Sequence, residues 1–331
     1  MQRVAGYGAA LAMLPYFVVK TVWTLDGLRG GGLHDGAWSR LDWSLINGLT
    51  VGMAGAAILL GLALGQGWGM RIPGWTVLGP AWIGGGFLVP MILVIPALLA
   101  VAPEGEAAPV TPAVPSWELI MLSLSFAGFG LAVAIAFPLY VRHRWPDAFT
   151  GRAPTAGATR AVQGTVATVA AAVAVGIGLP QMYWSLGGTA GLNQATLDNR
   201  DGQWHLLTGN SGLWALIAAW SVWTVTRRTA AGSPIPLLLS WIASGFLFAW
   251  GSWKAVFAFA VVPDFPPPEP LWALAGINHF GALAGLAILL LALMSTARAS
   301  ETAQKVTARG DVSGHHRLSL EGRRPTRSPD L

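Results

Sequence analysis

Long apolar segments alternate with short polar connections along most of the chain. An α-helix needs about 20 apolar residues to cross the hydrocarbon core of a bilayer, and each segment has roughly that length. The connections are rich in Gly, Pro and charged residues, which favour turns. The pattern predicts an all-α membrane protein with eight transmembrane helices, at approximately residues 4–25, 44–66, 76–101, 117–140, 161–185, 206–226, 236–262 and 271–296.

Parts of this pattern occur twice. Two tryptophans separated by 20 residues bracket the first connection and again the fifth: Trp23 and Trp43, then Trp184 and Trp204. The motif WIGGGFL at residues 82–88 returns as WIASGFL at residues 241–247. We therefore predict two tandem four-helix repeats, residues 1–145 and 146–297. Because four is an even number, both repeats have the same orientation and are related by a pseudo-two-fold axis along the membrane normal.

The composition is that of an integral membrane protein. Charged residues make up only 11% of the chain, against about 25% in soluble domains, and the mean hydropathy is +0.54. Without cysteine the chain forms no disulfide, no thiolate metal site and no thiol nucleophile. Arg far outnumbers Lys, and Ala and Gly are abundant, as in proteins of GC-rich bacteria. We therefore expect a bacterial inner membrane.

Basic residues are distributed unequally between the two sides of the predicted membrane. If the N-terminus is cytoplasmic, the outer connections carry only Arg29, Arg40 and Arg200, and the other basic loop and tail residues lie inside. Cytoplasmic loops are enriched in Arg and Lys, so both termini are predicted to be cytoplasmic. Residues 298–331 form a predicted disordered basic tail. This charge pattern indicates orientation and no nucleic-acid binding.

Residues 183–192, YWSLGGTAGL, close the fifth predicted helix. They resemble the hallmark of a family of small bacterial membrane proteins with about four helices, whose first helix ends in aromatic-Trp-x-Leu-Gly-Gly. The function of that family is not established, and its members commonly have His near the place of Gln181. The first half of the chain carries a looser version: Lys20, Trp23, Leu25 and Gly27, with Asp26 in place of the first Gly. The resemblance implies four-helix membrane units, here duplicated.

Ionisable residues inside spanning segments are costly, and they mark functional sites or helix contacts. Lys254 and His279 are predicted at similar depth below the outer face, on consecutive helices, with Asn278 beside His279. They either bind a ligand or form a hydrogen bond between the two helices. Trp250 and Trp253 are further candidates, for lining a cavity.

Lys20 lies three residues before Trp23, close enough to the interface for its side chain to reach the headgroups. Lys20 therefore has two alternative roles, anchoring of the helix at the headgroups or binding of a ligand. Gln181, at the place of the family's His, is another candidate for ligand binding. Asn47 and Asn210 are predicted to link helices through buried amides.

Glycine and tryptophan have predicted packing roles. Glycines four apart place small residues where two backbones approach closely, at Gly48/Gly52, Gly61/Gly65 and Gly281/Gly285. Tryptophans at helix ends are predicted to form aromatic belts at headgroup level. Among them are Trp23, Trp43, Trp184 and Trp204 at the outer ends, and Trp68, Trp75, Trp145 and Trp223 at the inner ends.

No Gly-x-Ser-x-Gly, His-Glu-x-x-His or Gly-Lys-Ser/Thr motif occurs in the sequence. The histidines and aspartates that could bind a metal do not form pairs at helical spacing, so we expect no metal site. A haem held by two histidines needs two imidazoles deep in the membrane, and only His279 is placed so; we therefore expect no cofactor. The residues considered for the metal are His34, His205, His279, Asp198 and Asp201.

Three functions stay open. The first in rank is a non-enzymatic protein that binds or transports a small molecule or lipid. The second is a structural protein that uses its basic tail to bind anionic headgroups or a protein partner. The third is a membrane enzyme that acts on an apolar or lipid-linked substrate, with His279 as acid or base.

Overall fold

Every described segment of regular structure in the computed structural model is helical. The structure describes residues 1–30, 40–101, 116–146, 158–198, 200–227, 235–257 and 276–294. Its long helices are α1 (Gln2–Arg29), α2 (Arg40–Gly65), α3 (Trp75–Ala100), α4 (Ser116–Arg144), α5 (Ala158–Ser185), α7 (Gly202–Arg227), α8 (Ile235–Phe257) and a last helix, Gly276–Met294. Two short helices, η1 (Gly67–Met70) and α6 (Gln194–Asp198), lie in connections.

Each predicted spanning segment coincides with one long helix, so the all-α class is confirmed for the described residues. Where a helix end is described, it lies within about one helical turn of the prediction. The predicted helix ends at residues 258–262 and 271–275, and the predicted tail at residues 298–331, lie outside the described residues.

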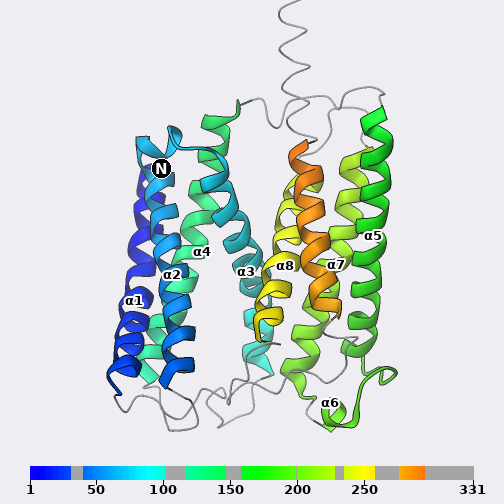
Figure 1. Cartoon of the computed structure of the whole chain (residues 1–331), viewed down its shortest axis with the longest axis horizontal. Helices are drawn as coiled ribbons and strands as arrows, with labels where there is room; N and C mark the ends of the chain where they lie inside the picture. Colours follow the sequence, from blue (N-terminus) through cyan, green and yellow to red (C-terminus); the bar gives the residue numbers. More distant parts are fainter. Residues whose placement is uncertain are drawn as a thin grey trace, which may run out of the picture.

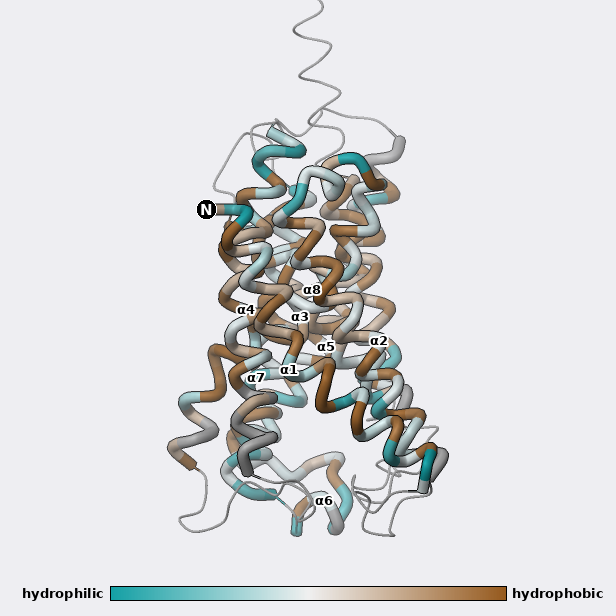
Figure 2. The backbone as a smooth tube through the Cα atoms, turned by 90° about the vertical axis from the view of Figure 1, so that its left-hand side faces the viewer, coloured by the Kyte–Doolittle hydropathy of each residue, from teal (hydrophilic) through white to brown (hydrophobic). Residues whose placement is uncertain are grey.

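Seven of the described helices are long and apolar enough to cross a membrane, namely all the long ones except α7. Large apolar side chains cover the outside of the bundle: Leu11, Leu131 and Leu283 are 65%, 66% and 64% exposed. Hydrophilic residues gather toward the two ends of the bundle (Figure 2). An apolar exterior of this extent requires lipid around it, so the chain is a multi-pass membrane protein.

Two hydrophobic cores lie side by side in the bundle (Figure 1). The first is formed mainly by α1, α2 and α4 and includes Ala9, Met13, Leu64, Phe129 and Tyr140. The second is formed by α5, α7, α8 and the last helix and includes Ala174, Trp214, Ala218, Phe246 and Ile288. Helix α3 stands between the two cores and packs mainly on α8.

The contact between α3 and α8 is a crossing of bare backbones. A Cβ atom added to Gly86 would lie 2.1 Å from the carbonyl carbon of Gly245, and one added to Gly245 would lie 2.5 Å from the Trp82 carbonyl oxygen. Beside this crossing, Trp82 Nε1 donates a 2.9 Å hydrogen bond to Ser244 Oγ. Gly86 and Gly245 occupy the same place in the two copies of the recurring motif, residues 82–88 and 241–247.

Glycine also brings α1 and α2 together. A Cβ atom on Gly61 would lie 2.7 Å from the Ala10 nitrogen, and one on Gly6 would lie 2.5 Å from the Gly65 nitrogen. The predicted close packing of Gly61 and Gly65 is therefore confirmed. The same prediction is wrong for Gly52, because a Cβ atom there would meet nothing within 4 Å.

Substitution of Gly86 by Ala tests the α3–α8 crossing. The added methyl group meets the backbone of Gly245, which has no side chain to move aside, so we expect the variant to lose about 1–3 kcal/mol of stability. The measurement is the melting temperature of the purified chain in detergent.

Gly84→Ala and Gly85→Ala are matched controls on the same helix. A Cβ atom at either position meets nothing within 4 Å, so both variants should melt at or above the temperature of the original protein. Equal melting temperatures for all three variants would show that the α3–α8 crossing is looser than described.

Candidate functional site

A group of polar and aromatic side chains, which we name the Lys20 cluster, joins α1 to α2. It consists of Tyr16, Lys20, Trp23, Trp43 and Asn47. The half-buried Lys20 donates a 2.9 Å hydrogen bond from Nζ to Asn47 Oδ1. The same ammonium lies 3.9 Å from the centre of the Trp23 ring and 6.0 Å from that of Tyr16. Among the described residues, an amide oxygen and two aromatic rings thus contact this ammonium.

Further hydrogen bonds hold the Lys20 cluster in place. Trp43 Nε1 donates to the Trp23 carbonyl at 3.1 Å, and Asn47 Nδ2 donates to the Trp43 carbonyl at 2.8 Å. Asn47 therefore links the two helices, as predicted. The predicted belt role is wrong for Trp23 and Trp43, which are only 6% and 8% exposed and pack against each other.

Lys20 lies farther from the end of its helix than predicted. Helix α1 continues to Arg29, which adds about 13 Å of helix after Lys20 at 1.5 Å per residue. The helix stops at Gly30, whose φ of 77° lies in the left-handed region. Anchoring at the headgroups therefore describes Lys20 less well than a role inside the bundle.

The stretch that resembles the family hallmark, residues 183–192, ends α5 and folds the chain back onto it. Gly187 has a φ of 99°, and the amides of Gly187 and Gly188 donate to the carbonyls of Trp184 and Tyr183, each at 3.0 Å. This hydrogen-bond pattern is a Schellman motif, which favours glycine at the left-handed position. Trp184 Nε1 adds a 2.9 Å bond to the Ala190 carbonyl.

The two halves differ at this helix end because Asp26 stands where the second half has Gly187. In α1 the helix passes through Asp26 and closes one turn later, at Gly30. Gln181 is half-buried and lies three residues before Trp184, as Lys20 does before Trp23. The polar position before the tryptophan is therefore shared, but only the first half places a charge there.

Lys254 and His279 lie on neighbouring helices, as predicted, and both side chains are exposed. A Cβ atom on Gly251 would lie 2.5 Å from the Asn278 carbonyl oxygen, which places the end of α8 directly against the start of the last helix. Asn278 itself is half-buried. The structure thus brings these candidates to one region near the end of the bundle.

Trp250 and Trp253 pack against α3. Their ring centres lie 5.2 Å and 6.3 Å from that of Phe87, in edge-to-face geometry. Trp250 Nε1 is buried and has no hydrogen-bond partner among the described residues. The two indoles therefore contribute to the contact between the two cores.

The histidines considered for a metal are not brought together by the described part of the chain. His205 Nδ1 lies 3.0 Å from the Ser185 carbonyl oxygen, whereas His279 lies on the last helix and His34 is outside the described residues. Within the described ranges, no group of three or more His, Cys, Asp or Glu side chains is placed to hold a metal.

No protein-family model, curated protein or solved structure matches the chain. The resemblance of residues 183–192 to the family of small membrane proteins therefore stays an expectation.

Substitution of Gly187 by Ala tests the end of α5. A left-handed conformation costs an L-residue with a Cβ atom about 1–2 kcal/mol, so we expect a lower melting temperature. Gly176→Ala is the control on the same helix, since a Cβ atom there meets nothing within 4 Å. If Gly187→Ala melts like Gly176→Ala, the helix does not depend on this glycine for its end.

Proposed function

We propose that the protein belongs to a bacterial inner membrane, that it binds or transports a small molecule or lipid, and that an acidic group of this ligand pairs with the Lys20 ammonium. The proposal includes eight membrane crossings in two similarly oriented four-helix repeats, residues 1–145 and 146–297. Both termini lie in the cytoplasm in this arrangement, as the distribution of basic residues favours.

The position of α7 supports the eighth crossing. Its 26 residues match the other spanning helices in length, and it packs against α5 and α8 (Figure 1). Its polar residues His205, Thr208 and Asn210 are half-buried, so neighbouring helices shield them in part from lipid. Such shielding is the usual condition for polar side chains at membrane depth.

Corresponding contacts support the two repeats. Gly86 and Gly245, at equal places in the recurring motif, meet each other at the α3–α8 crossing. A Cβ atom on Gly48 would contact Thr24 at 3.7 Å, and one on Gly209 would contact Ser185 at 3.2 Å. These two contacts correspond when residues are counted from Trp23 and Trp43 in one half and from Trp184 and Trp204 in the other.

The environment of Lys20 is the observation that carries the ligand proposal. A charge inside a bundle of spanning helices is expensive and is retained mainly for ion, proton or ligand binding. Asn47 and Trp23 hold the ammonium in place through an oxygen and a ring face.

The chemistry of the Lys20 cluster supports binding over catalysis. Among the described residues, the ammonium contacts an amide oxygen and two aromatic ring faces, which hold a charge in place for an ion pair. Lys254 and His279 form the second candidate ligand site. Because both side chains are exposed, they should bind an anion more weakly than Lys20 does. The partner-binding tail, residues 298–331, lies outside the described residues and stays a hypothesis.

Topology can be tested cleanly because the chain has no cysteine. We expect Thr189→Cys, in the connection after α5, to react with a membrane-impermeant maleimide in intact spheroplasts. Ser300→Cys, in the tail, should react only after lysis. Three crossings separate the two positions if α7 spans the membrane; labelling of both from the same side would contradict the eighth crossing.

Substitution of Lys20 by Gln tests the ligand. The change removes the charge and installs the residue that the second half has at position 181. We expect an acidic small molecule or lipid that co-purifies with the protein in native nanodiscs to be depleted by about tenfold or more, because a hydrogen bond to a charged group contributes about 1.5–3 kcal/mol. The measurement is mass spectrometry of the extracted ligands.

Two further variants serve as a control and as a test of the second candidate site. Arg3→Gln removes an exposed charge from the same helix and should leave the bound ligands unchanged. Lys254→Gln tests the second candidate, and depletion by this change alone would move the site to Lys254 and His279. If Lys20→Gln lowers only the melting temperature, Lys20 links two helices and the ligand proposal fails.

A further inference from the structure

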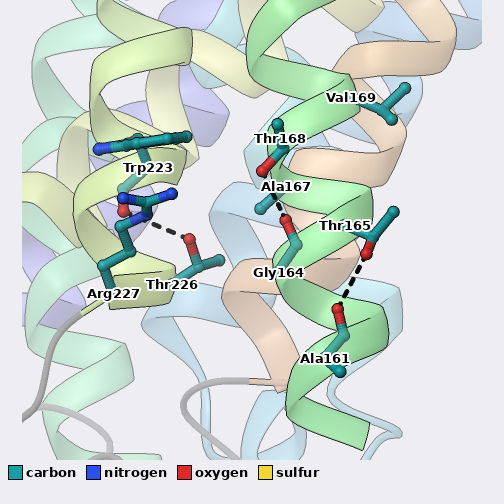
Figure 3. A pocket seen from close by; sticks show the side chains of 9 residues that line it. All are labelled: Ala161, Gly164, Thr165, Ala167, Thr168, Val169, Trp223, Thr226 and Arg227. Atoms are coloured by element: carbon teal, nitrogen blue, oxygen red, sulfur yellow. Dashed lines mark hydrogen bonds between the residues drawn. The ribbon is translucent and has the colours of Figure 1, made fainter.

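A groove opens between α5 and α7 at the end of the bundle where α7 stops (Figure 3). Its volume is about 500 Å³, within the range of small-molecule sites. Helix α5 lines it with Gly164, Thr165 and Thr168, and α7 lines it with Trp223, Thr226 and Arg227. We name it the α5–α7 groove. It lies at the opposite end of the bundle from α6, and it shares no residue with the Lys20 cluster.

The α5–α7 groove exists because this helix pair lacks glycines that close the corresponding space between α1 and α2. Counted from the paired tryptophans, Gly6 and Gly65 correspond to Ala167 and Thr226. The backbones of Gly6 and Gly65 touch, since a Cβ atom on Gly6 would lie 2.5 Å from the Gly65 nitrogen. Ala167 and Thr226 carry side chains that prevent such an approach.

The other ends of α5 and α7 are joined closely. A Cβ atom on Gly212 would lie 3.0 Å from the Gly178 carbonyl oxygen, and one on Gly178 would lie 2.8 Å from the Leu216 side chain. The two helices are thus held together near α6 and leave room between them near Arg227. A Cβ atom on Gly164 would meet nothing within 4 Å, in agreement with open space in the groove.

Arg227 is the charged residue of the described groove lining. Its guanidinium carbon lies 3.2 Å from the centre of the Trp223 ring, so the planar group stacks on the indole, as Figure 3 shows. Stacking fixes the plane of the guanidinium and leaves its N–H groups at the edge, where they can donate to two oxygens of an anion. None of the described lining residues is acidic, so nothing in them competes for the guanidinium.

The threonines make the rest of the groove neutral and partly apolar. Thr165 and Thr168 donate their hydroxyls to the carbonyls of Ala161 and Gly164 at 3.1 Å and 2.8 Å. Their methyl groups and the remaining oxygen lone pairs are left for an occupant. The lining therefore offers one positive group at the helix end and weakly polar walls along the helices.

We propose that the α5–α7 groove binds an anionic phospholipid, with its phosphate on Arg227 and part of one acyl chain along α5. The position at the end of a spanning helix, beside an exposed tryptophan, is the depth of lipid headgroups. The charge of Arg227 selects an anionic headgroup, and the space at Gly164 accommodates a chain. This site is independent of the ligand proposed for Lys20.

Native mass spectrometry of the full chain in mixed micelles tests the proposal. The micelles contain phosphatidylglycerol and phosphatidylcholine in equal amounts, and the measured quantity is the preference for bound phosphatidylglycerol. We expect Arg227→Gln to lower this preference by about fivefold, the effect of one basic residue near a membrane surface. Gly164→Leu fills the groove without touching the charge and should lower the amount of both bound lipids.

Arg142→Gln is the matched control, because Arg142 is an exposed arginine in the last turn of α4 at the same end of the bundle. It should keep the preference, because it removes a positive charge from the same end of the bundle without touching the α5–α7 groove. An unchanged preference in Arg227→Gln overturns the proposal. Full displacement of phosphatidylglycerol by millimolar inorganic phosphate also overturns it, since the groove would then be a site for the free ion.

Discussion

Close backbone contact at glycine is the interaction on which this bundle depends. Lipid tails are as apolar as the helix surfaces, so helices associate by close packing and hydrogen bonds rather than by a hydrophobic driving force. Gly86 and Gly245 supply such a contact between the two cores, and Gly6 and Gly65 supply one within the first core. Where the second half has Ala167 in place of glycine, the corresponding helix pair, α5 and α7, leaves a groove. The presence or absence of a methyl group therefore determines both the packing and the open space.

The helices could be predicted from sequence because a spanning segment needs a long apolar run, which is a local property. The end of α1 was harder to place, because Asp26 replaces a left-handed glycine and lets the helix continue to Arg29. Lys20 was therefore expected nearer the headgroups than the structure places it. The C-terminal end of α5 was predicted correctly at residue 185, and there the second half has the left-handed Gly187 in place of Asp26.

The candidate site was less accessible to sequence reasoning than the helices. Lys20 was identified from the sequence as a ligand candidate near the interface, and Asn47 as a link between helices. Their hydrogen bond joins α1 to α2 and depends on the relative rotation of these two helices. Apolar spacing does not determine that rotation in a helix that is hydrophobic on most sides. The groove beside Arg227 was not predicted at all. The detectable signal was the replacement of Gly6 and Gly65 by Ala167 and Thr226 at matching positions.

The proposed duplication gives these differences a physical meaning. Two identical four-helix units that paired as separate chains would carry every site twice, because one sequence would form both halves. Joining them in one chain lets each half change alone.

The first half has closed its α1–α2 contact with glycines and placed a charged side chain at Lys20, where the second half has neutral Gln181. The second half has opened its α5–α7 contact and placed a stacked Arg227 at the opposite end of the bundle. The contact that cannot diverge freely is the α3–α8 crossing, because Gly86 and Gly245 are each other's partners and a side chain on either one would separate the two cores.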